Sequence, residues 1–412
     1  MAALVSRSID AMNTAATDPA TAPLRALVTG GTGGIGRAIC QRLAAEGHRV
    51  VVADLDHGAA EGFATALGPE HAGLGVDLTD STATAGLPRR AAERVGGALD
   101  LIVNNAGLTD SSGHDMTAMP NAIFDRIVAV NLTAVTQICA AAPEVLKPGG
   151  TLVNIASGGA FRPLPLRGPY SATKAAVVAL TRELAAPWRS AGLRICAVGP
   201  GFTLTPMVQA LHAAGRLDLE SVAASIPLGR LGQPSDIADA VALLIGPAGD
   251  ALNGQTLVVD GGSAAGNAPM AGPARGTERT GTTVVLSHDH ADDSAVTATP
   301  ALAAVIDRRG DAAAEVVLRR ARDLSRLCAG HSGRARNFAL LFVSSGADLA
   351  AQSGLAMLAR ILALEWAPSG ARVNALIWHG PPTEGLTRLC EYLTGPQSAF
   401  VTGQRIEGGH TD

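Results

Sequence analysis

A tyrosine, a lysine and a serine of this sequence have the types and spacing of a proton-transfer site. Tyr170 and Lys174 are four residues apart in a segment with helical periodicity, so they share one helix face. Ser157 lies 13 residues before Tyr170, at the end of the preceding strand-like run. A phenol with a pKa near 10 needs a neighbouring cation to act as a base at neutral pH, and Lys174 would supply that charge. Ser157 would hydrogen-bond the substrate oxygen and stabilise the charge that develops on it.

The competing interpretation of Tyr170 and Lys174 is a surface pair, which this spacing commonly produces. Against it stands the basic composition: of 32 basic residues, only Lys147 and Lys174 are lysines. Because the chain otherwise uses arginine for positive charge, a lysine at this position favours a chemical role.

A glycine-rich string, Thr29 to Gly36 (TGGTGGIG), joins a strand-like run to a helical one. Glycines let the backbone turn sharply and approach a pyrophosphate, while the start of the helix offers free N–H groups. The alternative is a tight turn with no ligand, but the position between strand and helix favours a nucleotide. The candidate cofactor-binding residues here are Gly30, Thr32, Gly34, Ile35 and Gly36.

An acidic residue, Asp54, ends the second strand-like run, 18 residues after Gly36. A carboxylate at this distance can accept hydrogen bonds from the adenosine ribose and would repel a 2′-phosphate. The sequence therefore favours NAD over NADP, with Leu55 as a further contact. Two points leave NADP open: Asp54 could serve only as a turn cap, and Arg37 and Arg49 lie close by in sequence.

From Leu24 onward, short β-branched runs alternate with helical stretches. LRALVTG and HRVVVADL flank the helical GRAICQRLAAEG, which Gly47 should end. LDLIVNNAG, GGTLVNIAS, LRICAVGPG and QTLVVDGG follow, separated by the helical NAIFDRIVAVNLTAVTQICAAA and YSATKAAVVALTRELAAPW. This alternation predicts an α/β fold, a doubly wound parallel sheet covered on both faces.

The composition divides the chain into four parts. We expect a flexible N-terminal segment at 1–22, a domain holding these motifs at 23–262, and an Ala-, Gly- and Pro-rich linker at 263–281. Residues 282–412 form the fourth part, and they repeat the first domain incompletely. Trp366, Gly370 and Arg372 each lie 178 residues after Trp188, Gly192 and Arg194, and TGQRIEGG near the end repeats NGQTLVVDGG.

The second copy lacks the chemistry of the first. At the same offset, Asp348 and Gln352 replace Tyr170 and Lys174, and VVLSHDHADD has no glycine-rich string. We therefore expect a second, truncated domain that neither catalyses nor binds a dinucleotide. The HDHADD run at 288–293 could ligate zinc, but a polar turn after a strand is commoner, so we predict no metal site.

Together these residues resemble the short-chain dehydrogenase/reductase family over about residues 24–262. Thr29–Gly36 is similar to its TGxxxGIG fingerprint, and Ser157, Tyr170 and Lys174 match its catalytic residues. PLGRLGQPSDIADAV resembles the endings of 3-ketoacyl-(acyl-carrier-protein) reductases and secondary-alcohol dehydrogenases. Cys196 departs from the asparagine of many members, and we expect only a packing change. The resemblance implies a Rossmann fold, Asn131 as the holder of a proton-relay water, and cofactor contacts from Asp77, Leu78, Asn104, Ala106, Gly107, Tyr170, Lys174, Pro200, Gly201, Thr203 and Thr205.

The resemblance implies reversible hydride transfer between a nicotinamide cofactor and a ketone or secondary alcohol. We expect NAD(H), with two alternatives: an NADP(H)-dependent 3-ketoacyl thioester reductase, and a catalytically silent NAD-binding scaffold. Substrate choice should lie in the loops 108–120, 158–169 and 202–227, the last resembling a closing lid. Phe161, Leu164 and Leu166 suggest an apolar wall, while Arg162 and Arg167 could meet an anionic group or be solvated.

Helices expected near 312–328 and 349–366 correspond to those that family members use to pack into dimers. We hypothesise that the second half mimics a partner subunit, which implies a homodimer or a pseudo-tetramer.

Composition limits the remaining partners and the compartment. A net charge of −4 and a pI near 6.2 provide no basic field for nucleic acid. No apolar run of the length of a membrane span and no signal peptide are visible, so we expect no membrane partner. Five scattered cysteines without a CxxC pair indicate a reducing compartment, and we expect a cytoplasmic enzyme.

Overall fold

The computed structural model describes residues 23–110, 114, 118–162, 166–213, 215, 217–266, 286–287, 303–307, 339–344, 349–367, 371–379 and 383–409. These residues form two compact units. The N-terminal unit runs to Leu217 and includes Gln233–Val258, and the C-terminal unit comprises Asp218–Gly232 and the residues from Val259 onward. The predicted flexible segment at 1–22, most of the predicted linker and the predicted helix at 312–328 lie outside the described residues.

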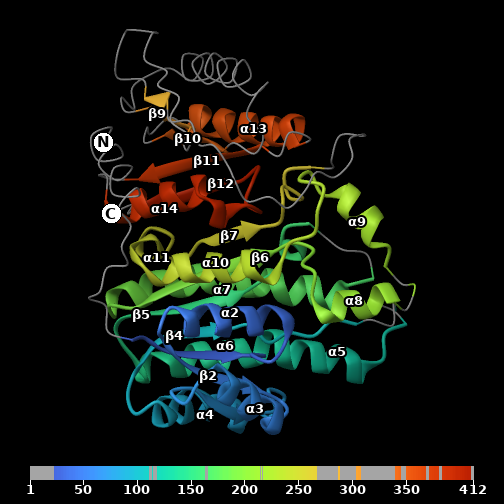
Figure 1. Cartoon of the computed structure of the whole chain (residues 1–412), viewed down its shortest axis with the longest axis vertical. Coiled ribbons are helices and arrows are strands. Elements are labelled where there is room, and N and C mark those ends of the chain that lie inside the picture. The colour runs from blue at the N-terminus through green and yellow to red at the C-terminus, as the bar shows by residue number, and fades with distance from the viewer. Residues whose placement is uncertain are drawn as a thin grey trace. The chain divides into compact units, whose positions relative to one another are not determined.

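The N-terminal unit is built on a seven-stranded sheet of strand order β3-β2-β1-β4-β5-β6-β7 (Figure 1). Its strands pair in parallel, as the registers of β1 with β2 and of β5 with β6 show. The predicted doubly wound parallel fold is therefore confirmed. The strands are β1 (Arg25–Thr29), β2 (Arg49–Asp54), β3 (Ala72–Gly75), β4 (Leu99–Asn104), β5 (Leu146–Ile155), β6 (Arg194–Pro200) and β7 (Thr256–Val259).

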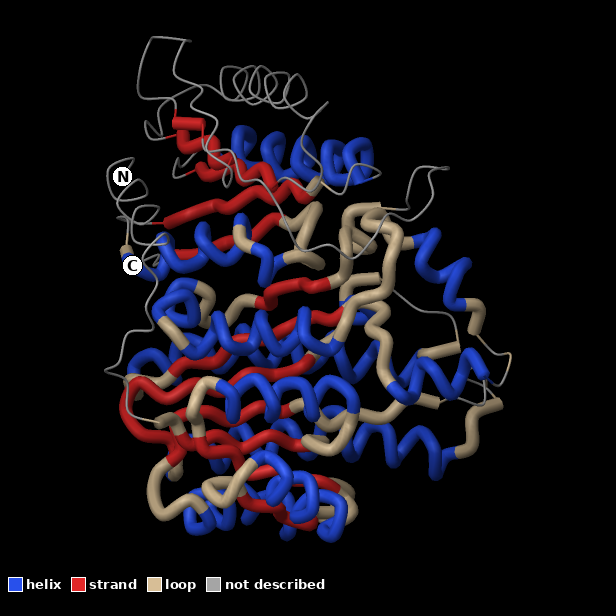
Figure 2. The backbone as a smooth tube through the Cα atoms, viewed as in Figure 1, coloured by secondary structure: helices blue, strands red, loops and turns tan. Residues whose placement is uncertain are grey.

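Helices pack along the sheet between successive strands (Figure 2). Helix α2 packs against α10, and α4 packs against α6. Asp56 and Asp80 cap α3 and α4 by accepting hydrogen bonds from backbone N–H groups of the first turn. The helices of this unit are α2 (Gly34–Ala45), α3 (His57–Leu67), α4 (Ser81–Arg94), α5 (Asn121–Val128), α6 (Ala134–Ala141), α7 (Gly168–Ser190), α8 (Pro206–Ala213), α10 (Pro234–Ile245) and α11 (Pro247–Ala251).

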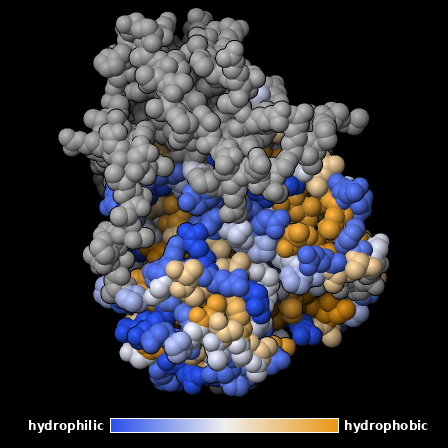
Figure 3. Space-filling model, viewed as in Figure 1, coloured by the Kyte–Doolittle hydropathy of each residue, from blue (hydrophilic) through white to orange (hydrophobic). Residues whose placement is uncertain are grey.

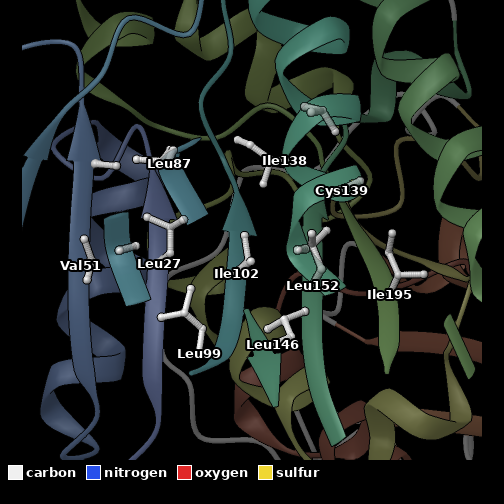
Figure 4. Packing of buried hydrophobic residues seen from close by; sticks show 14 of the residues in the cluster. Leu27, Val51, Leu87, Leu99, Ile102, Ile138, Cys139, Leu146, Leu152 and Ile195 are labelled. Carbon is white, nitrogen blue, oxygen red and sulfur yellow. The ribbon is translucent and has the colours of Figure 1, made fainter. Parts of the chain in front are cut away.

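The core lies where helices cover the central strands (Figure 4). Leu27, Ile102 and Leu152, on β1, β4 and β5, are fully buried. Strands buried on both faces are typical of parallel sheets, and each such side chain contributes roughly 1.5–3 kcal/mol of transfer free energy. Residues Asn121–Glu144 are long and apolar enough to cross a membrane by composition. However, Val135, Ile138 and Cys139 of this stretch belong to the core cluster, which identifies it as a core helix.

One strand and its two flanking helices were not predicted from the sequence. Strand β3 reads Ala72-Gly73-Leu74-Gly75 and carries no β-branched residue. A Cβ atom at Gly73 would lie 2.2 Å from the backbone nitrogen of Glu61 in α3. Close packing of the helix on the strand therefore selects glycine over the residues that normally signal a strand.

The C-terminal unit contains a smaller five-stranded sheet, of order β12-β11-β10-β9-β8. The order corresponds to β7-β6-β5-β4-β1 of the first sheet, without equivalents of β2 and β3. This finding confirms a truncated second copy of the fold. Its strands are β8 (Leu286–Ser287), β9 (Ala303–Asp307), β10 (Ala339–Ser344), β11 (Arg372–His379) and β12 (Arg405–Gly409), and its helices include α9 (Leu219–Ser225), α13 (Leu349–Trp366) and α14 (Glu384–Thr394).

The two units divide at a different place from the predicted boundary near Gly262. The segment Asp218–Gly232, which we placed in the first domain, groups instead with the residues after Val259. The physical reason is packing: Leu228 donates a backbone hydrogen bond to the carbonyl of Gly261, and Gly261 donates one to Phe400.

Candidate active site

The glycine-rich loop closes tightly between β1 and α2. Gly30 has a φ of +61°, and a Cβ atom at Gly36 would lie 2.1 Å from the carbonyl oxygen of Gly30. No side chain caps the start of α2 at Gly33. The loop therefore has the close backbone packing and the uncapped helix start that suit a pyrophosphate.

Two residues that we did not single out brace this loop. The side-chain nitrogen of Asn105 donates to the carbonyls of Thr29 and Gly30, at 2.9 and 3.0 Å. The hydroxyl of Thr29, which is buried, accepts from the backbone nitrogens of Asn105 and Ala106. The sequence held a signal for both, since they flank the glycine string and the predicted sheet motif.

Asp54 lies at the carboxyl end of β2, against the glycine-rich loop. Its Oδ2 accepts from the backbone nitrogen and the hydroxyl of Thr32, at 3.0 and 2.5 Å. Its Oδ1 accepts from the nitrogen of Leu55, whose side chain is 61% exposed. The structure thus brings together Asp54, Leu55 and the loop, as a ribose-binding site requires.

The two arginines that complicated the cofactor choice have partners of their own. Arg49 pairs with Glu70 at 2.8 Å. The guanidinium of Arg37 stacks on the ring of Phe63, 4.0 Å from its centroid, and its Nε contacts the carbonyl of Thr32 at 3.5 Å. The acidic group is thus the one that contacts the loop's Thr32 side chain.

Asp77 and Leu78 follow β3 at the same edge of the sheet. The nitrogen of Val76 donates to the carbonyl of Asp54 at 2.8 Å, which places the two strand ends side by side. Hydrogen bonds from the backbone and hydroxyl of Thr79 lower the pKa of Asp77, so this exposed carboxylate stays ionised. An ionised acceptor at this position suits an adenine amino group.

The residues after β4 link the loop to the reacting end. Buried Asn104 donates to Asn154 at 2.9 Å, and Asn154 donates to Thr181 at 3.0 Å, so three neighbouring elements are joined. Ala106 follows in the same chain segment. A Cβ atom at Gly107 would lie 3.3 Å from Lys174 Nζ.

The segment Pro200–Thr205 after β6 lies against the glycine-rich loop. A Cβ atom at Gly34 would lie 3.0 Å from that of Thr205. The hydroxyl of Thr203 donates to the carbonyl of Gly201 at 3.1 Å, and Thr205 accepts from the nitrogen of Val208 at the start of α8. The predicted nicotinamide segment therefore meets the predicted pyrophosphate loop.

Tyr170 and Lys174 lie on α7, and Ser157 ends the β5 segment. Burial raises the pKa of Tyr170, while a hydrogen bond with the Ser157 side chain and the nearby charge of Arg167 lower it. The Oγ of Ser157 also accepts from the nitrogen of Gly159 at 3.0 Å, which fixes its position. A phenol and a hydroxyl in contact at the sheet's carboxyl edge can share a substrate oxygen.

Lys174 is buried, and its Nζ donates to the carbonyl of Ile155 at 2.7 Å. The ammonium lies 5.9 Å from the centroid of the Tyr170 ring. Burial lowers the pKa of Lys174 to about 8. Two of its three possible donor positions are not used by this carbonyl, so they remain for a ribose or a water.

Asn131 lies in a π-helical turn, Ala129–Thr133, that interrupts the long helix formed by α5 and α6. Its side chain both accepts from the nitrogen of Leu108, at 2.7 Å, and donates to the carbonyl of Leu108, at 2.8 Å. This pair of bonds holds the chain after β4 beside Lys174. Turns of this kind are frequent at functional sites. The water-holding role of Asn131 stays a prediction.

Three apolar side chains are exposed around this edge: Phe161, Leu166 and Phe202 are 48, 52 and 37% exposed. Leu166 adopts a φ of +61°, a conformation that costs energy for a branched residue. Apolar residues also gather where Figure 1 places α8, in the space-filling view (Figure 3). Arg167, to which we assigned no role, contacts Thr109 at 3.4 Å and acts on the charge of Tyr170.

Comparisons with known proteins agree with this geometry. Residues 30–264 match the family described as enoyl-(acyl carrier protein) reductase. The chain belongs to the short-chain dehydrogenase/reductase family. It is therefore an oxidoreductase that acts on CH–OH groups with a nicotinamide cofactor, and its substrate is a small molecule.

The relatives have varied substrates. A 2-(S)-hydroxypropyl-CoM dehydrogenase of Xanthobacter autotrophicus is 38% identical over 248 residues, which cover 58% of this chain and 95% of that enzyme. A short-chain type dehydrogenase/reductase of Sinorhizobium fredii, y4vI, is 37% identical over 246 residues, covering 59% of this chain but only 44% of that protein.

A solved structure of a 3-ketoacyl-(acyl-carrier-protein) reductase from Brucella melitensis, complexed with NADH, is 31% identical. It superposes with a TM-score of 0.53 and covers 58% of this chain and 97% of its own. These matches cover little more than half of this chain.

Cys196, the departure from the family pattern, is a buried packing residue. Its thiol contacts the carbonyls of Gly249 and Leu252, at 3.5 and 3.4 Å. Burial raises the pKa of this thiol to about 12, so it stays neutral.

Proposed function

We propose that this protein is an NAD(H)-dependent dehydrogenase/reductase of ketones and secondary alcohols that uses Ser157, Tyr170 and Lys174. The observation that carries the proposal is the buried Lys174 ammonium on α7, one turn from a Tyr170 that hydrogen-bonds with Ser157. Burying an ammonium is costly, so its retention beside a phenol favours a chemical purpose. This arrangement also argues against a silent scaffold.

In the reductive direction, each side chain has one task. Tyr170 donates its proton to the carbonyl oxygen, and Ser157 holds that oxygen by a hydrogen bond. Lys174 makes Tyr170 a stronger acid and would bind the cofactor's ribose through its unused donors. The nicotinamide cofactor supplies the hydride. A water held near Asn131 and Lys174 would return a proton to Tyr170, and oxidation reverses these steps.

Two features support NAD(H) as the cofactor. The Asp54 carboxylate contacts Thr32 of the glycine-rich loop, where a 2′-phosphate would meet repulsion. Arg49, which could offset that repulsion, is paired with Glu70. The relevant atoms would be the ribose hydroxyls against Asp54, the pyrophosphate at Gly34 and Ile35, and the adenine against Leu55, Asp77 and Leu78.

The second candidate is an NADP(H)-dependent 3-ketoacyl thioester reductase. It is supported by the 3-oxoacyl-[acyl-carrier-protein] reductase FabG of Vibrio cholerae, 32% identical over 239 residues. Exposed Phe161, Leu166 and Phe202 would suit an acyl chain, while Arg167 beside Tyr170 would suit an anionic group on either kind of substrate.

Substitution of the proton donor tests the chemistry. We expect the Tyr170→Phe protein to lose roughly 10²–10⁴-fold of its turnover on a panel of ketones, since this is the usual share of general acid catalysis. NADH binding, measured by fluorescence, should stay close to that of the unsubstituted protein. Full turnover by the Tyr170→Phe protein would contradict the mechanism.

A further inference from the structure

The last turn of the predicted lid is held by the C-terminal end of the chain. Phe400 is fully buried, and its carbonyl accepts from the nitrogen of Gly261 at 2.9 Å. The guanidinium of Arg230 lies over the Phe400 ring, 4.5 Å from its centroid. The nitrogen of Leu228 donates to the carbonyl of Gly261 at 3.2 Å. Gly261 is thus hydrogen-bonded on one side to the lid segment and on the other to Phe400.

The packing around Gly261 leaves no space for a methyl group. Gly261 has a φ of +64°, and a Cβ atom there would lie 2.5 Å from the Phe400 ring and 2.7 Å from Ile226 Cγ2. A Cβ atom at Gly262 would lie 3.1 Å from Thr402. Three chain segments therefore meet in direct van der Waals contact, and such interiors transmit a displacement of one segment to the next.

A buried carboxylate fixes the segment that lies between them. Asp260 accepts from the nitrogens of Gly262 and Ala264, at 2.9 and 2.7 Å, and from Gln404 Nε2 at 3.2 Å. Arg360 of α13 donates to the carbonyl of Ala264 at 3.0 Å. The turn that carries Gly261 is therefore locked to the second sheet by several independent hydrogen bonds.

The held segment continues directly into the predicted substrate-covering chain. Ile226 and Arg230 belong to Asp218–Gly232, which packs within the C-terminal unit. The same stretch begins, further back, at Thr203 and Thr205, the predicted nicotinamide contacts. It ends at Gln233, whose backbone nitrogen donates to Asp236 at 2.7 Å in the capping box of α10.

We propose that Phe400 is a positioning residue for the substrate-covering segment, so that the C-terminal unit controls substrate affinity without contributing a group to the chemistry. Phe400 fixes Ile226–Arg230 through Gly261 and through its stacking with Arg230. Since the leading end of the stretch is fixed by Thr205, fixing the trailing end limits the positions that the residues between can adopt. This proposal rests on the proposed function for the identity of the substrate site.

The test compares the Phe400→Ala protein with the Leu341→Ala protein as a matched control. Leu341 is a leucine that is 1% exposed on β10 of the same sheet. In the full-length Phe400→Ala protein, we expect hydrogen exchange of peptides within 218–232 to accelerate by about 10-fold or more, because local opening becomes easier. Exchange of peptides that contain Tyr170 or the glycine-rich loop should not change.

Kinetics with the best ketone of the panel give a second readout. We expect KM to rise by about 5–20-fold in the Phe400→Ala protein with kcat and NADH affinity within about two-fold, the pattern of lost substrate binding without lost chemistry. The Phe400→Leu protein, which keeps apolar volume but loses the stacked ring, should fall between.

Two results would overturn the proposal. One is unchanged exchange of the 218–232 peptides in the Phe400→Ala protein. The other is an equal change in the Leu341→Ala protein, which would assign the effect to general loosening of the sheet. Exchange needs no substrate, so a failure to reduce any ketone would count against the proposed function alone.

Discussion

The two sheets of this chain share a scaffold and differ in chemistry. In the first sheet, Gly254 donates to the carbonyl of Ile195 at 2.7 Å and Ala197 donates to Gln255 at 2.9 Å. In the second sheet, Gly403 donates to Val373 at 2.7 Å and Ala375 donates to Gln404 at 2.8 Å. These four bonds occupy equivalent positions, so the repeat predicted from sequence is preserved down to single backbone contacts.

The side chains that face the first active site have no such counterparts. The second sheet has Gln352 at the position of Lys174, and Gln352 is buried near Arg405, 3.5 Å away. By strand register, Val305 and Phe342 stand where Asn104 and Asn154 form their buried hydrogen bond. Backbone pairing thus survives the loss of function, whereas buried polar side chains persist where chemistry needs them.

The largest expected difference between the two units comes from their equivalent residues. The Lys174→Met change should lower turnover by roughly 10²–10³-fold, because Tyr170 loses the cation that tunes its acidity. The Gln352→Leu change should leave turnover within about two-fold, because that side chain touches no reacting group. Steady-state kinetics with NADH and a ketone compare them, and equal losses would contradict the assignment of chemistry to one unit.

A smaller effect should appear in the pH dependence of reduction. Burial lowers the pKa of Lys174 to about 8, so the ammonium loses its charge as pH rises through that value. We expect kcat/KM for ketone reduction to decline above about pH 8, and a flat profile up to pH 10 would count against Lys174 as the tuning cation.

The same shift affects stability with a defined sign. Between about pH 8 and the ordinary lysine pKa of 10.5, the unfolded chain binds the Lys174 proton and the folded protein does not. The Lys174 contribution to stability therefore rises with pH in this window. Gln352 does not titrate, so the second unit lacks this contribution.

The smallest effect concerns the buried asparagine pair. The Asn104→Val change leaves Asn154 without its donor and should lower the free energy of unfolding by about 1–3 kcal/mol. Urea denaturation of both single variants and of the double variant with Asn154→Val measures this. The double variant should cost less than the sum of the single ones, and additive costs would show that the two residues are not coupled.

Much of this architecture could be predicted because it is written in local patterns. The alternation of strands and helices, the Thr29–Gly36 string and the Tyr170–Lys174 spacing all depend on neighbours in sequence. Strand β3 could not be predicted, because Gly73 is selected by contact with α3. Arg167 and the bracing by Asn105 depend on loop geometry, and the packing of Ile226 with Gly261 joins residues far apart in the chain.

A calorimetric titration of the full-length protein with NADH, repeated with NADPH and with the Asp54→Ala protein, tests the central claim most directly. That claim is one nicotinamide site per chain, built by the first sheet and selective through Asp54. We predict one NADH per chain, an affinity about 10-fold or more above that for NADPH, and loss of this preference in the Asp54→Ala protein. Two NADH per chain, or tighter binding of NADPH to the unsubstituted protein, would contradict it.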